Sequence, residues 1–190
     1  SNLTDSLTAT DASVVSLRAD ITASDTSWAQ LNINDLTDGQ NENNTVVLGS
    51  IPSGITSTAV KNTLVGVDAG AAITTEDECT LIGYQAGLNN TAANCVMIGS
   101  DAGKFFTNGT QNTFIGRQSG LGSSGNSTGN NNTGVGHKST KNLTTGTSCT
   151  GVGSFALQHL QTGNNMTGIA RNAGKDVTQG TGSVFIGYEA

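Results

Sequence analysis

The chain has 190 residues, of which 26 are glycine, 34% are hydrophobic, 4% are aromatic and only 12% are charged. A single compact globule would need a richer apolar core, so this composition favours an elongated assembly with a thin core over a compact enzyme. The net charge of −6 and the lack of a basic run argue against nucleic acid as a partner. The sequence has no transmembrane stretch or signal peptide, and we expect no membrane insertion.

Residues 1–36 are predicted to form a coiled-coil stalk. Positions 1–31 lack proline and glycine. Steps of four and three alternate, as in the a/d seam of a coiled coil, along Leu3, Leu7, Thr10, Val14, Leu17, Ile21, Ser24, Trp28 and Leu31. Serine, threonine and aspartate are weak helix formers, so this helix needs partner helices. The seam residues expected in the core of the stalk are Leu3, Leu7, Val14, Leu17, Ile21 and Trp28.

Residues 37–60 are interpreted as a transition segment. They are rich in Asn, Asp and Gly and contain the only proline of the chain, Pro52. The acidic and amide residues at positions 35, 38, 41, 42 and 43 match a calcium loop in composition but lack its spacing. We therefore expect a solvated linker here and no metal site.

Residues 61–190 are predicted to form a repetitive β fibre, because a glycine preceded by an aliphatic residue recurs at a near-constant spacing. These anchoring positions are Gly49, Gly66, Gly83, Gly99, Gly116, Gly136, Gly153, Ala170 and Gly187, and the interval from Gly116 to Gly136 is the longest. A sustained period of this kind indicates units that pack on their neighbours. Because Ala170 would tolerate a positive φ poorly, we interpret the slot as requiring lack of bulk rather than positive φ.

Each anchoring residue is expected to end a short strand with two patterned faces. The residues one and three positions before it are β-branched or aliphatic in every unit, and they share one strand face. The residue between them points the opposite way and is apolar in the first five units. We expect the first face to lie inside each rung, and the second to form an outward ladder covered by another copy of the chain. The alternative is a wider coil of the same chain that covers this ladder.

Beyond the anchor, a small residue three positions on and a glycine four positions on predict a corner, with Thr140 and Leu157 as departures. We expect a second strand and a glycine turn to follow the corner. The residues expected in the fibre core are Leu64, Leu81, Met97 and Phe114 of the outward ladder, Val65, Ile82, Ile98 and Ile115 of the inward face, and the anchors Gly66, Gly83, Gly99 and Gly116.

No pattern in the sequence predicts catalysis, and we expect neither an enzyme nor a cofactor. The glycine-rich run 120–125 matches a dinucleotide-binding fingerprint in letters, but no βαβ unit follows it. His137 and His159 lack a repeated acidic partner for a catalytic triad or a metal site. Asp68 and Asp101 share a slot after the anchor, and we interpret them as solvated corner residues rather than the carboxylate pair of a glycosidase.

Cys79, Cys95 and Cys149 all stand four positions before the anchor, where other units have asparagine. Their odd number and their spacing fit neither a disulfide framework nor a zinc site, so we interpret them as small strand residues. Cys79 and Cys95 are expected to be vertical neighbours. A bridge between them would have to meet strict geometry, and we do not predict one.

The stretches Asn62–Gly70, Thr80–Gly87 and Asn112–Gly120 follow the pattern Asn-Thr-x-Ile-Gly-x-x-Ala-Gly, each with one departure. They resemble the repeats of phage tail fibres that end in an intramolecular chaperone of the endosialidase type, and they are similar to the head repeats of trimeric autotransporter adhesins. This resemblance, which covers residues 45–190, implies a homotrimeric β-solenoid, β-roll or β-prism fibre joined to a trimeric coiled-coil stalk. The glycines at positions 134, 151 and 168 depart from the pattern and imply either closer packing or a different cross-section in the later units.

The resemblance implies a structural fibre protein of a phage or virus tail, located in the virion, that gives rigid reach and contributes to host-surface attachment. The expected partners are two further copies of the chain, other tail or baseplate proteins, and a host cell-surface glycan or protein. Contact residues are expected in the turns 104–112 and 121–131. The alternatives are a bacterial trimeric surface adhesin, which would be extracellular, and a polysaccharide-degrading tailspike. The chain is expected to be a fragment of a longer protein.

Overall fold

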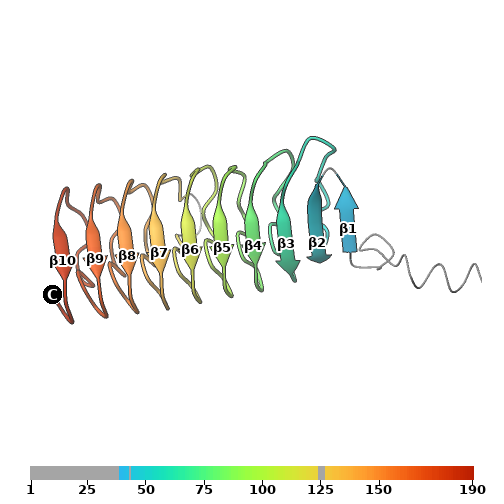
Figure 1. Cartoon of the computed structure of the whole chain (residues 1–190). Helices are drawn as coiled ribbons and strands as arrows, with labels where there is room; N and C mark the ends of the chain where they lie inside the picture. The colour runs from blue at the N-terminus through green and yellow to red at the C-terminus, as the bar shows by residue number, and fades with distance from the viewer. Residues whose placement is uncertain (1–38, 43, 124–126) are drawn as a thin grey trace, which may run out of the picture. The chain divides into compact units, whose positions relative to one another are not determined.

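The residues described by the computed structural model, 39–42, 44–123 and 127–190, form ten strands in a single sheet. In chain order these are β1 (Gly39–Glu42), β2 (Thr45–Gly49), β3 (Thr63–Gly66), β4 (Thr80–Ile82), β5 (Val96–Ile98), β6 (Thr113–Ile115), β7 (Thr133–Val135), β8 (Thr150–Val152), β9 (Thr167–Ile169) and β10 (Val184–Ile186). The strands lie side by side in their order along the chain (Figure 1). The stalk predicted for residues 1–36, with its seam from Leu3 to Trp28, lies outside the described residues.

Strands β2 to β10 pair in parallel, so each repeat unit makes one rung of a parallel β-solenoid. The register pairs equivalent positions of neighbouring units, as when Thr63 lies opposite Thr80 and Val65 opposite Ile82. The described residues contain no helix. The predicted repeat and its β character are confirmed. Strand β2 belongs to the segment 37–60, and β1 pairs with it in antiparallel fashion.

The longest unit keeps the same strand register as its neighbours. Thr113 of β6 lies opposite Thr133 of β7, so the extra residues are absorbed outside the strand. The amide of Phe105 donates to the carbonyl of Leu121, and the amide of Thr107 donates to that of Ser127. The insertion therefore falls between residues 121 and 127, where it leaves the stack of rungs intact.

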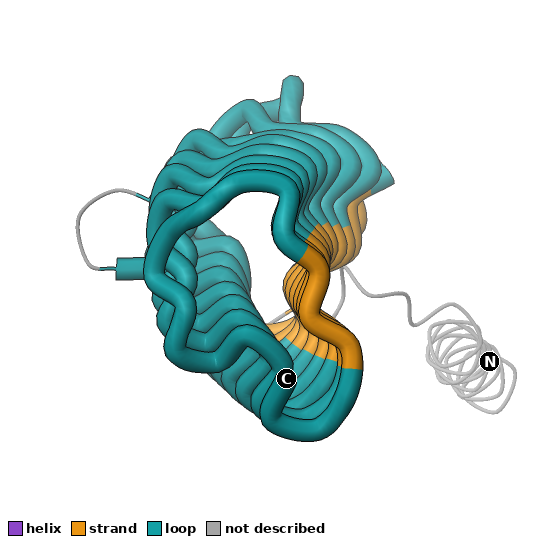
Figure 2. Tube along the Cα trace, turned by 90° about the vertical axis from the view of Figure 1, so that its left-hand side faces the viewer, coloured by secondary structure: helices purple, strands orange, loops and turns teal. Residues whose placement is uncertain are grey.

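Viewed along its axis, the solenoid is a coil in which one side is strand and the rest is turn (Figure 2). The second strand predicted after the corner is wrong: outside the named strands, the described residues contain only the isolated bridges Phe106–Ser127 and Asn164–Thr181. The reason is local hydrogen bonding. The amides of Phe106 and Leu143 donate to the carbonyls of Gly103 and Thr140, three positions earlier in the same rung, and cannot also join a ladder between rungs.

The two faces of the strands are reversed relative to the sequence-based expectation. The ladder expected to point outward is fully buried inside the coil of a single chain, where Leu64, Leu81, Met97 and Phe114 are 0% exposed. The alternative, that the chain covers this ladder itself, is the correct one. The coil encloses the larger side chains, and the ring of Phe114 packs against that of Phe106 with centroids 4.7 Å apart. The face flanking them, with Val65, Ile82, Ile98 and Ile115, points outward.

Apolar bulk moves from the strand to the corner in the later rungs. In the early rungs a large strand residue accompanies a corner glycine: a Cβ on Gly120 would overlap the ring of Phe114. In the β7 rung the arrangement is exchanged, because a Cβ on Gly134 would lie 2.5 Å from the hydroxyl of Thr140. Leu157 fills the equivalent space beside Gly168. The glycines in the later strands therefore make room for the larger corner residues Thr140 and Leu157, and the two changes compensate each other in volume.

The anchor slot requires both lack of bulk and a positive φ. In the rungs up to β8, a Cβ on each anchoring glycine would lie within 2.8 Å of the backbone of the next anchor. The anchoring glycines also have φ between 121° and 130°, and Ala170 has φ of 101°. Lack of bulk was predicted correctly, but the inference from Ala170 that φ need not be positive was wrong, since this alanine adopts the strained region.

Buried Asn and Cys residues four positions before the anchor link one rung to the next. The Asn132 side chain donates to the carbonyl of Gly146 at 2.9 Å and accepts from the amide of Cys149 at 2.9 Å. Cys149 occupies the equivalent slot, and its thiol donates to the carbonyl of Gly163 at 3.0 Å. Both side chains can donate to a backbone carbonyl of the turn that follows, which explains how either residue type can occupy this slot.

Candidate binding surfaces

The outward face of the sheet carries aliphatic and threonine side chains along the whole stack of described rungs. The residues one and three positions before each anchor are Val, Ile, Thr or Leu in every rung, and they form two parallel columns along the axis. Ile115 is 37% exposed, Val152 37% and Ile169 39%. No charged residue interrupts these columns. An unbroken β-branched surface of this kind is typical of a protein interface.

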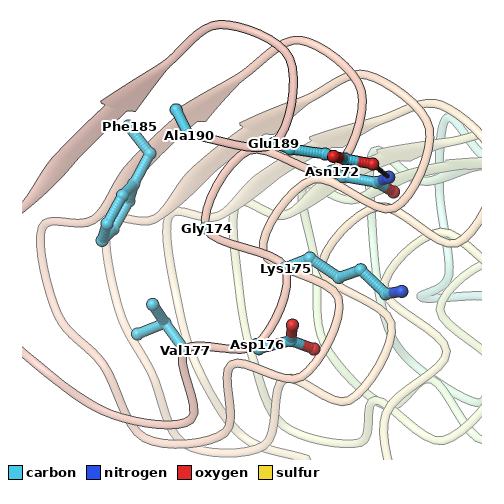
Figure 3. Close-up of a pocket in the computed structure, with 8 residues that line it drawn as sticks. All are labelled: Asn172, Gly174, Lys175, Asp176, Val177, Phe185, Glu189 and Ala190. Carbon is cyan, nitrogen blue, oxygen red and sulfur yellow. Dashed lines mark hydrogen bonds between the residues drawn. The ribbon is translucent and has the colours of Figure 1, made fainter.

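A hollow of about 510 Å³ lies at the C-terminal end of the coil (Figure 3). It is lined by Asn172, Gly174, Lys175, Asp176, Val177, Phe185, Glu189 and Ala190. Phe185 stands at the same strand position as Phe114, inside the rung, and Val177 at the same corner position as Phe106. The hollow is thus the interior of the last described rung, which no further described rung covers, and its wall is the exposed end of the core rather than a built ligand site.

A smaller hollow of about 320 Å³ lies beside the turn that the sequence favoured for partner contact. It is lined by Gly122, Ser123, Asn142, Thr144 and Gln161. Part of the expected contact turn 121–131 therefore does line a concave polar surface. The amide and hydroxyl groups there are suited to hydrogen bonding with a polar ligand, whereas apolar lining is scarce.

Asp68 and Asp101, weighed as a carboxylate pair, belong to a line of polar contacts across the β3, β4 and β5 rungs. Asp101 forms an ion pair with Lys104 at 3.1 Å, and Lys104 also donates to the side-chain oxygen of Gln85. Gln85 in turn donates to Asp68 at 3.4 Å. Gln85 and Lys104 therefore stand between the two carboxylates, and this arrangement does not form the open pair that glycoside hydrolysis needs.

The two histidines lie on different rungs and make different contacts. His159 lies 3.2 Å from a carboxylate oxygen of Asp176 on an exposed corner. His137 packs edge-on against Phe155, with ring centroids 5.1 Å apart. Partial burial is the first cause of its lowered pKa, and the charges of Lys138, Arg117 and Lys141 lower the pKa further. The structure does not bring the histidines together.

The remaining sequence candidates have structural roles. Cys79, Cys95 and Cys149 are buried free thiols in the described part of the chain. Cys79 and Cys95 are vertical neighbours, and the pKa of Cys79 is raised first by its hydrogen bond with the Cys95 side chain and then by burial. Gly120, which opens the glycine-rich run, is held against the ring of Phe114.

Within the described ranges, no group of three or more His, Cys, Asp or Glu residues could hold a metal ion. The same residues form no helix that is long and apolar enough to cross a membrane.

The fold defines the class of the protein as a parallel β-solenoid. Comparison with known proteins gave no match to a family model, to a curated protein or to a solved structure. Any assignment of function therefore depends on the surfaces of the solenoid itself.

Proposed function

We propose that the chain is a structural fibre protein that assembles as a homotrimer and gives rigid reach in attachment to a host surface. Phage or virus tail fibres perform this role in the virion, where the other partners would be tail or baseplate proteins and a host glycan or protein. The proposal assigns no enzymatic activity. A bacterial trimeric adhesin with the same architecture would perform the same mechanical task from a cell surface.

The observation that carries the proposal is the outward β-branched face. Side chains such as Ile98 and Ile115 fill no space inside their own rung, because the coil is already packed by Met97, Phe114 and Phe106. Nine parallel strands about 4.8 Å apart extend this face over roughly 40 Å, which is long for an apolar stripe on a monomer. Burial of the stripe against identical copies would stabilise them by about 25 cal/mol for each Å² of apolar surface removed from water.

Identical copies are the best partners for this face because its pattern repeats along the axis. A second copy aligned in parallel would place Val, Ile and Thr of one rung beside the same residues of its neighbour at every level. In an assembly with closed symmetry, every copy buries its outward face against another copy, and no such face stays exposed. Three copies agree with the seam pattern of residues 1–31, which also requires partner helices. Threefold symmetry would present each surface feature three times and strengthen weak contacts with a host.

A polysaccharide-degrading tailspike has less support. It needs two carboxylates with access to a glycosidic bond, whereas Asp68 and Asp101 are separated by the side chains of Gln85 and Lys104. The described corners from Ala102 to Lys175 contain no carboxylate at all. An attachment role needs only exposed turns on a rigid stack.

The test is the solution mass of the 190-residue chain by light scattering over a wide range of concentration. The expected mass is three times the chain mass of 19.2 kDa. Replacing Ile98→Asp and Ile115→Asp together should give a folded monomer, because charge is placed on the outward face and not in the core. The control Gln111→Asp, on an exposed turn, should remain trimeric. A stable monomer for the unaltered chain would overturn the proposal, as would a trimer that tolerates both aspartates.

A further inference from the structure

Charge is distributed unevenly along the solenoid. The chain has a net charge of −6, yet residues 102–175 contain no Asp or Glu. All the Lys and Arg residues of that stretch lie on the corners after the strands, where they meet solvent: Lys104, Arg117, Lys138, Lys141, Arg171 and Lys175. The middle and later rungs therefore form a cationic region in an acidic protein.

One group of these residues converges on the corners of the β6, β7 and β8 rungs. The amide of Lys138 donates to the carbonyl of Arg117 at 3.0 Å, and that of Phe155 donates to the carbonyl of His137 at 2.9 Å. The ammonium group of Lys138 lies 5.8 Å from the centroid of the Phe155 ring, which His137 contacts edge-on. Two cations and two aromatic rings thus share one surface over three successive rungs.

A second group repeats along the axis at a fixed corner position. Lys104, Lys141 and Lys175 each stand five positions after an anchor, in alternate rungs. The carbonyls of Lys141 and Lys175 accept from the amides of Gly122 and His159 of the preceding rungs, so the column is in register. With rungs about 4.8 Å apart, these ammonium groups recur roughly every 9.6 Å.

Most of these cations have no ionic partner among the described residues. Lys104 is paired with Asp101, whereas none of the other five forms an ion pair with a described residue. The lowered pKa of His137, caused first by partial burial and then by its three cationic neighbours, shows that this corner disfavours a further positive charge. An anion bound there would relieve the repulsion. Unpaired cations held beside aromatic rings are also a common arrangement for recognition of acidic ligands.

We propose that the cationic corner face, formed by Arg117, His137, Lys138, Lys141 and Phe155, binds an acidic polysaccharide that lies along the solenoid axis. The proposal rests on the proposed attachment function and names the ligand class for it. A polymer with charges at regular intervals matches cations that recur by rung. The rings of His137 and Phe155 offer apolar faces to sugar rings. The adjoining polar hollow, which includes Asn142, offers amides and hydroxyls for sugar hydroxyl groups.

An acidic polysaccharide is favoured over nucleic acid by the charge of the whole chain. The net charge of −6 opposes long-range attraction of a dense polyanion such as DNA. The corner face also lacks a row of stacking platforms, since of its aromatic residues only His137 and Phe155 are brought together by a described ring contact. A sparsely charged polymer needs only a few well-placed cations.

The experiment measures binding of the full 190-residue chain to alginate and to hyaluronan, with neutral dextran and a double-stranded DNA oligonucleotide as comparisons. Titration calorimetry at about 0.05 M and 0.2 M salt gives the affinity and its ionic part. We expect the two acidic polysaccharides to bind and to weaken as salt rises, and dextran not to bind. DNA that binds more tightly than both would overturn the proposal in favour of a nucleic-acid surface.

Variants assign the binding to this face. Replacing Lys138→Gln and Lys141→Gln together should weaken polysaccharide binding by about tenfold or more. The matched control is Lys61→Gln, because Lys61 is paired with Glu78 at 2.9 Å outside the cationic region, and its affinity should change by less than about twofold. The control removes one positive charge and the double variant removes two. If the control lost half or more of the binding free energy that the double variant loses, net charge alone would govern binding, and the proposed site would be overturned.

A second readout separates binding from structural effects and from the assembly of the fibre. Nuclear magnetic resonance should show the pKa of His137 rising when the polysaccharide is added, since a bound anion favours the imidazolium; an unchanged pKa would place the ligand elsewhere. Light scattering on the same samples reports the oligomer. A trimer that does not bind acidic polysaccharide refutes this site alone, whereas a monomer that binds it refutes the trimeric fibre and leaves the site standing.

Discussion

The Cβ that Gly153 lacks would lie 2.5 Å from the carbonyl oxygen of Ala170 on the next rung. Real Cβ atoms do not approach backbone oxygens so closely, so the two chain segments touch only because Gly153 has no side chain. Ala170 itself carries a methyl group at a φ of 101°, a conformation that L-amino acids rarely adopt. The column of anchors therefore contains one strained member.

Replacing Gly153→Ala should destabilise the solenoid by about 2–5 kcal/mol, the sum of backbone strain and overpacking against the next rung. The measurement is the free energy of unfolding from urea titration followed by circular dichroism. Gly54→Ala is the control, because Gly54 lies in an exposed turn with an ordinary φ and a Cβ there would meet only a methyl group of Thr74. A loss of similar size at Gly54 would contradict the close contact between anchors.

The reverse exchange, Ala170→Gly, should stabilise the chain by about 1 kcal/mol, because glycine adopts this φ without steric cost. The midpoint of thermal unfolding should rise. Ala173→Gly, in the same rung, is the matched control: Ala173 is buried and has no positive φ, so that change should lower stability by about 0.5–1 kcal/mol or more. If Ala170→Gly lowered stability as Ala173→Gly does, the positive φ at the anchor slot would be wrong.

The Asn and Cys slot gives a third prediction. Asn132→Ala would leave the amide of Cys149 and the carbonyl of Gly146 without partners in a buried position, at a cost of about 2–5 kcal/mol. Cys149→Asn should be tolerated within about 1 kcal/mol, because asparagine donates to the equivalent turn carbonyl in another rung. Asn108→Ala on the exposed surface is the control and should change stability by less than about 0.5 kcal/mol. Unfolding in urea compares the three variants.

Much of this fold could be predicted from the sequence, because both the spacing and the residue types of the repeat constrain it. The spacing of the anchors indicated the rung, and the β-branched residues before Gly66 and Gly83 indicated the strand and its register. The sequence pattern did not show which face of the strands is buried inside the coil. A period of two separates the faces, but only the volume inside the coil decides that Leu64 and Phe114 face inward while Val65 and Ile115 face out.

The candidate binding surface was harder to predict because its residues are scattered in sequence. Arg117, Lys138 and Phe155 are neighbours only when rungs are aligned in register, and a search for a contiguous basic run misses them. Two signals were present in the sequence. Residues 102–175 contain no carboxylate, and the regular repeat places the cations in equivalent corner slots. Together they identify a charged face before any coordinates are known.

The exchange of volume between Gly134 and Thr140 predicts a coupling that can be measured. Gly134→Ala should destabilise the chain, because its Cβ would lie 2.5 Å from the Thr140 hydroxyl. Adding Thr140→Gly should recover at least about 1 kcal/mol of this loss, since it restores the corner glycine of the earlier rungs. A double-mutant cycle in urea gives the coupling energy. The distant pair Gly134→Ala and Asn108→Ala should be additive, and additivity for Gly134 with Thr140 would contradict the exchange.

The lowered pKa of His137 predicts a pH dependence of stability. Burial, followed by the charges of Lys138, Arg117 and Lys141, holds this pKa below the value of 6.5 expected for an unfolded chain. The unfolded state therefore binds more protons near pH 6, and stability is lost as pH falls from above 6.5 through the folded pKa. His137→Gln removes this titration. The urea midpoint of the variant should fall less than that of the unaltered chain between about pH 7.5 and 5.5, a range in which the neighbouring Lys and Arg stay charged.

A second variant tests the cause of the lowered pKa. Lys138→Gln should bring the pKa of His137 closer to 6.5. If the urea midpoint of this variant fell more steeply with decreasing pH than that of the unaltered chain, Lys138 would not repel the imidazolium.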